Sequence, residues 1–526
     1  MSESPVIPEF AMFENNLEQS ELSDIATRLS AGIRSGKDRF MQFTDVVTEY
    51  VGSGEWRNRS EGFLTLCAKA SFLRGLYGYN QILAKHTTNI ACKGYAAAAY
   101  CRQSLDPRWL NNLQTYVNQA WQSKDYVVFA ELSGQLASIL VDLGYAERAK
   151  TIASESIDKV TKATVKDEKI RNRVQAALLR TRILMAPIDL QARNRDEAHV
   201  LLDSADETAR ILDHQLALTD ISYYRALILE DSHEYDRALE LANSALQQYE
   251  LMGYLHGVSR SRNLVGVIHM DRGESQDARD QFEELLVIQQ QLNDQVGLAK
   301  TLINVGEVDR DLEQLNQMEI YNRRALEISQ EAEYMRGIST SKINIGDVLL
   351  RRGEFEAAIK LYKESLEVAE CSGMRDLMVF IPFLIADAYF MQQDYEKALK
   401  IYREMNKVAI DYGYPLVHFH SIVSEIVTDW ELEKPVPKGM IEEVKDILGQ
   451  KTKWENESGT KRMRDVRAMI YEDPAMESDL CVLYDREKNY DCRFERKSAR
   501  KGCMGNLYWQ ASVCPHLLEF LEKLDE

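Results

Sequence analysis

A pattern of small and apolar residues repeats along much of the chain. Small residues recur at intervals of 40 positions, at Ala186, Ala226, Gly266, Gly306, Gly346 and Ala386. A further unit is centred on Ala137, 49 residues before Ala186, so we expect an insertion of nine residues there, within the segment KATVKDEKIR. Such a fixed period predicts an array of similar structural units.

A second series, with alanine at every position but one, follows the first. It lies twelve positions later, at Ala149, Ala198, Ala238, Ala278, Met318, Ala358 and Ala398. Turn signals separate the two series, around Gly144, Gly273, Gly353 and Asp394. The pattern predicts a helix, a short turn and a second helix in each unit. Two antiparallel helices need small residues where their axes come closest, and only stacked neighbours bury the apolar face of such a pair.

The motif resembles the tetratricopeptide repeat. After the small residue and the alanine at +12, aromatic residues stand at +16 in Phe282, Tyr362 and Tyr402, and alanines at +19 in Ala205, Ala245 and Ala325. The 40-residue version resembles the long-helix class found in kinesin light chain, in partner of inscuteable and in regulators of the MalT type. The resemblance covers about residues 126–412 and implies an all-α fold, a right-handed superhelical solenoid of antiparallel helix pairs. Met318 and Asn322 depart from the motif, and Pro187 is expected to kink or end its helix.

The expected organisation has four parts. Residues 1–16 form a disordered tail, and residues 17–125 a helical region of divergent repeats or a cap. Residues 126–450 form the array, with about seven repeats and a closing helix pair. Residues 451–526, rich in Cys, Arg and aromatic residues, form a small C-terminal module.

Composition and charge restrict the function. Only 10 prolines and 26 glycines occur in 526 residues, which favours helix. The net charge of −19 makes nucleic acid an unfavourable partner. We see no secretory signal and no apolar run long enough to span a membrane. Cys67, Cys92, Cys101 and Cys371 lie in helical patterns without close pairs, which is typical of reduced cysteines, so we expect a cytoplasmic protein.

Candidate binding residues follow from the resemblance, because the first helix of each tetratricopeptide pair lines a concave groove. The corresponding positions are Arg260, Asn263, Lys300, Asn304, Glu307, Arg310, Asn344, Asp347, Arg351 and Asp387. Asn304 and Asn344 resemble groove asparagines of the kinesin light chain repeats, and a carboxamide can both donate to and accept from a peptide backbone. The alternative is that these residues are solvated helix positions. The mixed signs suit a mixed peptide or a helix better than a terminal carboxylate.

The C-terminal module has two further candidate sites. Cys481, Cys492, Cys503 and Cys514 are spaced by eleven, with His516 nearby, and could provide zinc ligands. Because no close Cys-x-x-Cys pair occurs, ordinary cysteines are the favoured interpretation and no cofactor is expected. The basic residues from Lys461 to Lys501 could bind phosphate, but acids are about as frequent there. His418 and His420 face different sides of a helix and are expected to be structural.

The sequence therefore predicts a scaffold or adaptor that binds a protein partner, as a peptide or a helix, in a concave groove. Nucleotide-binding, hydrolase and metalloprotease motifs are absent, so no enzymatic activity is expected. The alternative is a sensor or regulatory subunit of a signalling or transcription-control system, whose array responds to a peptide or small ligand. The oligomeric state is left open.

Overall fold

In the computed structural model, the described residues are 17–31, 39–103, 107–142, 146–163, 165–191, 195–232, 234–312, 314–412 and 415–449. Every regular element within these ranges is helical. The predicted C-terminal module lies outside them, together with its cysteines. Among the described helices, none is long and apolar enough to cross a membrane.

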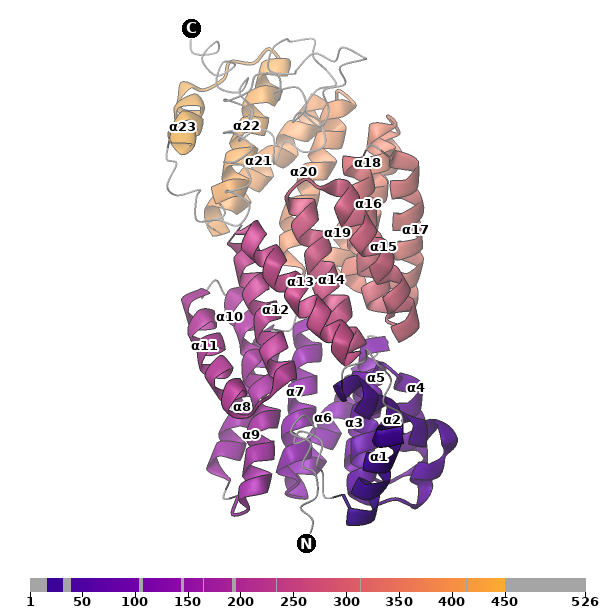
Figure 1. The fold of residues 1–526 in the computed structure, drawn as a ribbon. Coiled ribbons are helices and arrows are strands. Elements are labelled where there is room, and N and C mark those ends of the chain that lie inside the picture. Colours follow the sequence, from indigo (N-terminus) through magenta and orange to yellow (C-terminus); the bar gives the residue numbers. More distant parts are fainter. Residues whose placement is uncertain are drawn as a thin grey trace. The chain divides into compact units, whose positions relative to one another are not determined.

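The chain divides into two compact units, Met1–Thr301 and Leu302–Glu526. Figure 1 shows the helices of each. The helices that begin in the first unit are α1 (Gln19–Ala31), α2 (Arg39–Ser53), α3 (Glu61–Leu73), α4 (Tyr77–His86), α5 (Ile90–Gln103), α6 (Pro107–Gln122), α7 (Tyr126–Asp142), α8 (Ala146–Lys162), α9 (Glu168–Ile183), α10 (Met185–Gln191), α11 (Arg195–Ile211), α12 (Gln215–Asp231), α13 (Tyr235–Met252), α14 (Leu255–Asp271), α15 (Ser275–Leu292) and α16 (Gln295–Asp311). Those of the second unit are α17 (Leu315–Glu331), α18 (Met335–Arg351), α19 (Phe355–Cys371), α20 (Arg375–Met391), α21 (Tyr395–Tyr412), α22 (Pro415–Glu431) and α23 (Lys438–Gly449).

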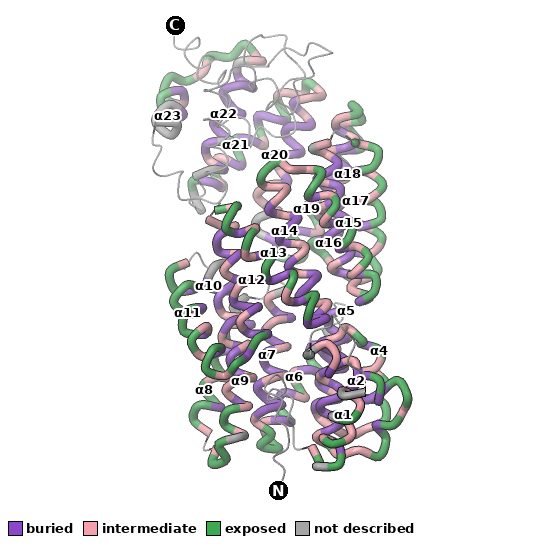
Figure 2. The backbone as a smooth tube through the Cα atoms, in the orientation of Figure 1, coloured by how far each residue is buried: buried purple, intermediate pink, exposed green. Residues whose placement is uncertain are grey.

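The predicted helix pairs are confirmed. In each repeat a first helix, such as α12, α14 or α18, packs against the following second helix, α13, α15 or α19. The first helices are buried on more sides than the second ones, and Figure 2 shows long exposed stretches along α11 and α17. Near Pro187 the expected break also occurs, because the first helix is split at Leu184 into α9 and α10.

In the units with glycine at the small position, this glycine lies against the +16 side chain of the second helix. A Cβ added to Gly346 would be 2.5 Å from Cε1 of Tyr362, and one added to Gly266 would be 2.6 Å from Cε1 of Phe282. Both distances are too short for carbon atoms in contact. The close approach that the sequence pattern predicts is therefore a steric requirement of the pair.

The first unit contains further helix pairs before the predicted array. Pairs α3–α4 and α5–α6 precede α7–α8, and first helix α3 packs on α5, which packs on α7. One hydrophobic cluster runs through all of them and includes Phe72, Tyr249, Met252 and Leu292. Residues far apart in the sequence thus share one core.

The N-terminal helix pairs contact the turn between α13 and α14 and the end of α15. Arg74 Nη1 donates to the carbonyl oxygen of Gly253 at 2.9 Å, and its Nη2 donates to Asp45 Oδ1 at 2.9 Å. Gly75, with φ of +69°, lies so close to Leu292 that a Cβ would be 2.3 Å from Leu292 Cδ2. The row of helix pairs from α3 to α14 therefore meets itself again through the turns after α3 and before α14, and we call this arrangement the closed ring.

Three of the four described cysteines, Cys67, Cys92 and Cys101, are buried and form no disulfide, as expected of reduced cysteines. Cys371 differs, because it ends α19 and is exposed. His418 is structural, as predicted: its ring nitrogens contact Asn406 Oδ1 at 2.7 Å and Glu443 Oε1 at 2.9 Å, which connects α22 to α21 and α23.

We expect Gly346→Ala to lower the free energy of unfolding by about 1–3 kcal/mol, because the new methyl group overlaps a ring that cannot move away. Tyr362 is fully buried and its hydroxyl is bonded to Asp347. Gly439→Ala is the matched control, since Gly439 lies in helix α23 with no atom within 4 Å of the added Cβ. Chemical denaturation of both variants measures the effect, and equal stabilities would contradict the steric requirement.

Candidate functional site

The residues predicted for the groove all lie on first helices. They are Arg260 and Asn263 on α14, Lys300, Asn304, Glu307 and Arg310 on α16, Asn344, Asp347 and Arg351 on α18, and Asp387 on α20. Most are half-buried, whereas Asn344 and Asp387 are buried, with 3% and 5% of their surface exposed.

In the second unit, Arg310, Asp347 and Arg351 form a cluster of mixed charge. Asp347 accepts a hydrogen bond from Tyr362 Oη at 2.6 Å. Burial raises the pKa of Asp347 above its ordinary value, although the Tyr362 hydrogen bond and the nearby charges of Arg310 and Arg351 act in the opposite direction. Asp387 makes the same bond one repeat later, with the hydroxyl of Tyr402. These carboxylates are thus tied to the aromatic position of their own repeats.

Asn344 has a different environment from that of a groove residue. Its Nδ2 donates to Asn322 Oδ1 at 3.0 Å, and Asn322 Nδ2 donates to the Met318 carbonyl at 2.9 Å. Asn322 replaces the aromatic residue of the repeat motif and is fully buried. The carboxamide of Asn344 therefore joins α17 to α18, and we do not include it among the ligand contacts proposed below.

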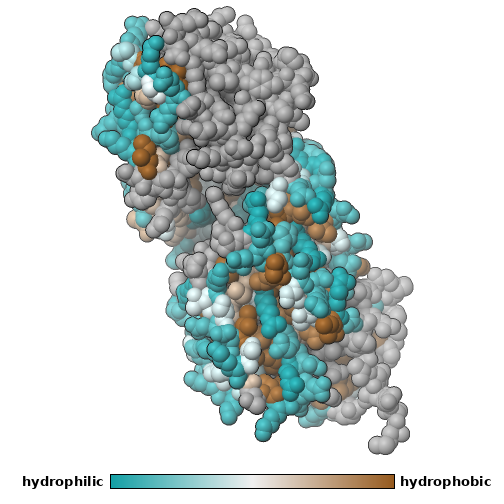
Figure 3. All heavy atoms as spheres, turned by 90° about the vertical axis from the view of Figure 1, so that its left-hand side faces the viewer, coloured by the Kyte–Doolittle hydropathy of each residue, from teal (hydrophilic) through white to brown (hydrophobic). Residues whose placement is uncertain are grey.

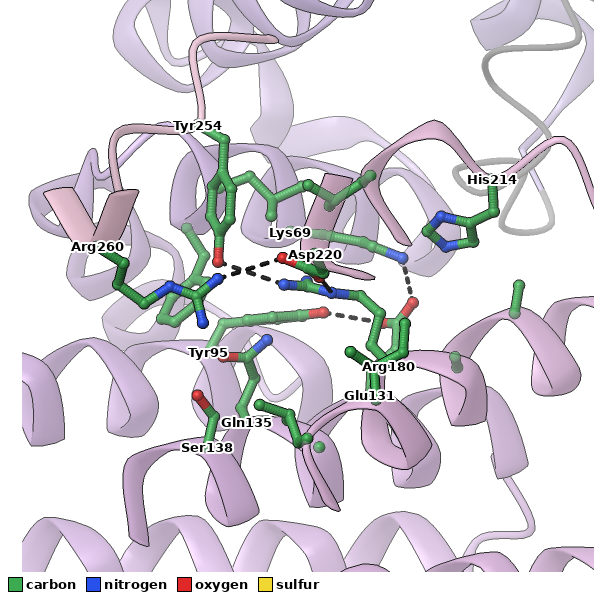
Figure 4. Close-up of a pocket in the computed structure, with 18 of the residues that line it drawn as sticks. Lys69, Tyr95, Glu131, Gln135, Ser138, Arg180, His214, Asp220, Tyr254 and Arg260 are labelled. Carbon is green, nitrogen blue, oxygen red and sulfur yellow. Dashed lines mark hydrogen bonds and ion pairs between the residues drawn. The ribbon is translucent and has the colours of Figure 1, made fainter. Parts of the chain in front are cut away.

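The first unit holds a row of charges along three successive first helices. Arg180, Asp220 and Arg260 are separated by 40 residues, one repeat each. Arg180 Nε donates to Asp220 Oδ2 at 2.9 Å, and Arg260 Nη2 donates to Asp220 Oδ1 at 3.2 Å. Figure 4 shows the two guanidinium groups on either side of the carboxylate.

Tyrosines complete this row. Tyr249 Oη donates to Asp220 Oδ1 at 2.6 Å. Arg180 Nη2 donates to Tyr254 Oη at 3.4 Å, and Arg260 Nη1 donates to Tyr224 Oη at 3.0 Å. Burial alone would raise the pKa of Asp220, but the charges of Arg180 and Arg260 outweigh it and hold the pKa below its ordinary value. Asp220 is therefore ionised at neutral pH.

The N-terminal pairs contribute a second set of polar groups. Glu131 on α7 is ion-paired with Lys69 on α3 and accepts a hydrogen bond from Tyr95 Oη at 2.9 Å. Arg102 on α5 donates to Ser138 Oγ at 3.2 Å and contacts His256 Nε2 on α14. The Arg102–His256 contact connects the two ends of the ring.

These two sets surround a cavity of about 60 Å³. It is lined by residues of the first helices α3, α5, α7, α9, α12 and α14 and by residues next to their ends. Figure 4 shows that the labelled side chains from these helices converge on one region. A cavity of this size holds a few water molecules or one compact ion.

Two histidines beside the charges are neutral. Burial, with the nearby charges of Arg180 and Lys69, lowers the pKa of His214 to about 4. Burial and the charge of Arg102 also hold the pKa of His256 well below its ordinary value. His214 Nδ1 accepts from the Ala217 backbone N–H at 3.1 Å, which caps α12.

The outer side of the first unit has exposed apolar residues. Figure 3 shows hydrophobic patches on the face where α11 lies. Val200 and Ile211 on α11 are 70% and 77% exposed, and an open hollow beside them contains Ile157, Met185 and Leu201. Four charged residues also line this hollow, Arg182, Asp189, Asp196 and Glu197, and Asp189 is paired with Lys150.

Of the cavity residues, sequence reasoning selected only Arg260. The row Arg180–Asp220–Arg260 had a signal, because its spacing equals the repeat length. Glu131 had the same signal, because it lies six residues before Ala137, as Arg260 does before Gly266. Lys69 and Arg102 had none, since they lie before the predicted array, in pairs without the repeat motif.

Comparison with protein families identifies the repeats. Two family models, both described as tetratricopeptide repeat, match residues 297–370 and 343–406. The chain contains tetratricopeptide repeats. The matched segment includes the predicted groove positions from Lys300 to Asp387, whereas the cavity lies in helices before it. No curated protein matches the chain.

Several solved structures resemble the chain at low identity. The apo form of RapI is 14% identical, with 75% of this chain and 98% of that chain covered and a TM-score of 0.49. A Rap protein complexed with competence and sporulation factor is 13% identical, with the same coverage and a TM-score of 0.48. A signal transduction ATPase with a tetratricopeptide repeat sensor from Pyrococcus horikoshii is 12% identical, covers 91% of this chain and 74% of that chain, and has a TM-score of 0.45. No function follows from these likenesses.

We expect His214 to make the protein less stable in acid. Because the pKa of His214 is about 4 when folded and 6.5 ordinarily, the unfolded chain binds the proton first. Stability is full above about pH 6.5 and is lost as pH falls toward 4. For His214→Asn, which keeps a capping acceptor, the loss between pH 7 and 4.5 should be smaller by about 2 kcal/mol.

Urea denaturation at several pH values measures this difference. His199→Asn, at an exposed position on α11, tests whether any histidine substitution flattens the profile. Identical pH profiles for wild type and His214→Asn would show that His214 is protonated as easily in the folded protein as in the unfolded chain.

Proposed function

We propose that this protein is a non-enzymatic scaffold or adaptor that binds a peptide or helix of a protein partner through its tetratricopeptide repeats. The supporting observation is the cluster of Arg310, Asp347 and Arg351 on the first helices α16 and α18, within the segment matched by the family models. Half-buried charges of both signs on preformed helices can select a ligand of matching charge with little ordering cost.

The ligand contacts in this proposal are Asn304, Glu307, Arg310, Asp347 and Arg351. On α16 the first three are spaced by three residues, and on α18 the last two are spaced by four, so each set lies along one side of its helix. The arginines would hold carboxylates of the partner, and Asn304 would contact its backbone. We expect this binding in the cytoplasm and without nucleic acid.

The second candidate function is a sensor. It is favoured by the closed ring of the first unit and by the charged cavity inside it, features that a scaffold does not need. In that case the repeats of the second unit would carry the output to a partner.

Affinity purification with mass-spectrometric identification tests the scaffold function. The test variant is Arg310→Gln with Arg351→Gln, and the control is Arg323→Gln with Arg352→Gln. The control arginines pair with Glu319 on the second helix α17, away from the cluster. Circular dichroism would confirm that both variants fold.

We expect specific partners to be retained by wild type and control and lost by the test variant. For a purified partner, loss of two charged hydrogen bonds should weaken binding at least tenfold. Retention of the same partners by both variants would place binding outside this cluster.

A further inference from the structure

The cavity of the first unit has more positive than negative charge. Its lining contains five cationic side chains, Lys69, Arg102, Arg173, Arg180 and Arg260, and two acidic ones, Glu131 and Asp220. Asp125 lies near Arg173 but outside the lining, and counting it still leaves two more cations than acids. The neutral histidines His214 and His256 do not change this balance.

The imbalance is sharpest at Asp220. Here a single carboxylate faces two guanidinium groups: Arg180 donates to one of its oxygens and Arg260 to the other. The Arg260 Nε atom is buried and has no hydrogen-bond partner. A guanidinium group buried with an unused donor is costly unless a further acceptor is present.

The donors around the space suit an oxyanion. Guanidinium groups bind phosphate and carboxylate oxygens through paired N–H donors, and Tyr224, Tyr254 and Ser138 add hydroxyl groups. Two surplus positive charges match a dianion better than a monoanion. The volume of about 60 Å³ limits the ligand to a phosphate group with at most a small substituent.

We propose that this cavity binds phosphate, either as the inorganic dianion or as the phosphate group of a small metabolite, with Arg180 and Arg260 as its principal ligands. This site is separate from the peptide contacts proposed above and does not depend on them. Its ligand is a small anion, and the residues that would bind this anion lie on the first helices α9, α12 and α14.

The position of the site implies a regulatory effect. Arg102 on α5 and Arg260 on α14 come from opposite ends of the ring, and Arg102 contacts His256 on α14. An anion between these side chains offsets their repulsion and stabilises the closed ring. Binding therefore couples phosphate concentration to the stability of the first unit.

Isothermal titration calorimetry and thermal unfolding of the full chain test the proposal, with potassium phosphate against potassium chloride, sulfate and acetate at equal ionic strength. We expect saturable binding of phosphate and a rise in Tm. Acetate should bind at least tenfold more weakly, because it carries one charge. A small phosphate monoester, glycerol 3-phosphate, distinguishes a metabolite site from a site for inorganic phosphate alone.

Two substitutions should act in opposite directions. Arg260→Gln should weaken phosphate binding at least tenfold, whereas Asp220→Asn should strengthen it several-fold, because it removes the carboxylate that competes for the same donors. Arg262→Gln is the matched control, since Arg262 lies on the same helix and pairs outside the cavity with Glu250 and Glu284. It should leave binding unchanged.

Equal effects of phosphate and chloride at the same ionic strength would overturn the proposal, because screening alone would then account for them. Weaker phosphate binding by Asp220→Asn would also overturn it. If Arg260→Gln does not fold, the opposite sign expected for Asp220→Asn still decides the result.

Discussion

One carboxylate holds together three repeats of the first unit. Asp220 on α12 receives donors from α9, α13 and α14, so the loss of its charge would leave two buried guanidinium groups facing each other. Hydrophobic packing fixes the spacing between helix pairs, but it does not determine which polar face turns inward. The shared carboxylate adds a polar link between the inward faces, because it gives Arg180 and Arg260 a common acceptor.

Local parts of the fold could be predicted from the sequence because they depend on contacts between neighbouring helices. Gly346 and Tyr362 are 16 residues apart, and the same steric requirement occurs two units earlier between Gly266 and Phe282. The closed ring could not be predicted in this way. Arg74 and Gly253 are 179 residues apart. Gly253 is a repeating turn position, because Asp213, Asn293, Glu333 and Gly373 also have positive φ, but Arg74 belongs to no such series.

For the candidate site, too, the sequence indicated the positions along the helices but not the contacts that each side chain makes. The chemistry of asparagine at a repeat position suggested Asn344 as a groove residue. Its role depends on the residue opposite, because Asn322 stands there in place of an aromatic side chain and hydrogen-bonds to the carboxamide of Asn344. Asp347 and Asp387 lie opposite tyrosines and bond to these instead. The same first-helix face therefore differs from repeat to repeat according to the residue at the +16 position.

The ring also affects how the chain folds during synthesis. Helices α3 to α5 leave the ribosome long before the residues around Gly253 that complete their environment. At about 5–20 residues per second, the interval corresponds to roughly ten to forty seconds. During this time Lys69 can already pair with Glu131 on α7, whereas Arg102 meets His256 only after α14 has been made. Closing so long a loop also makes this the step with the highest contact order in the first unit, and the one expected to limit its folding rate.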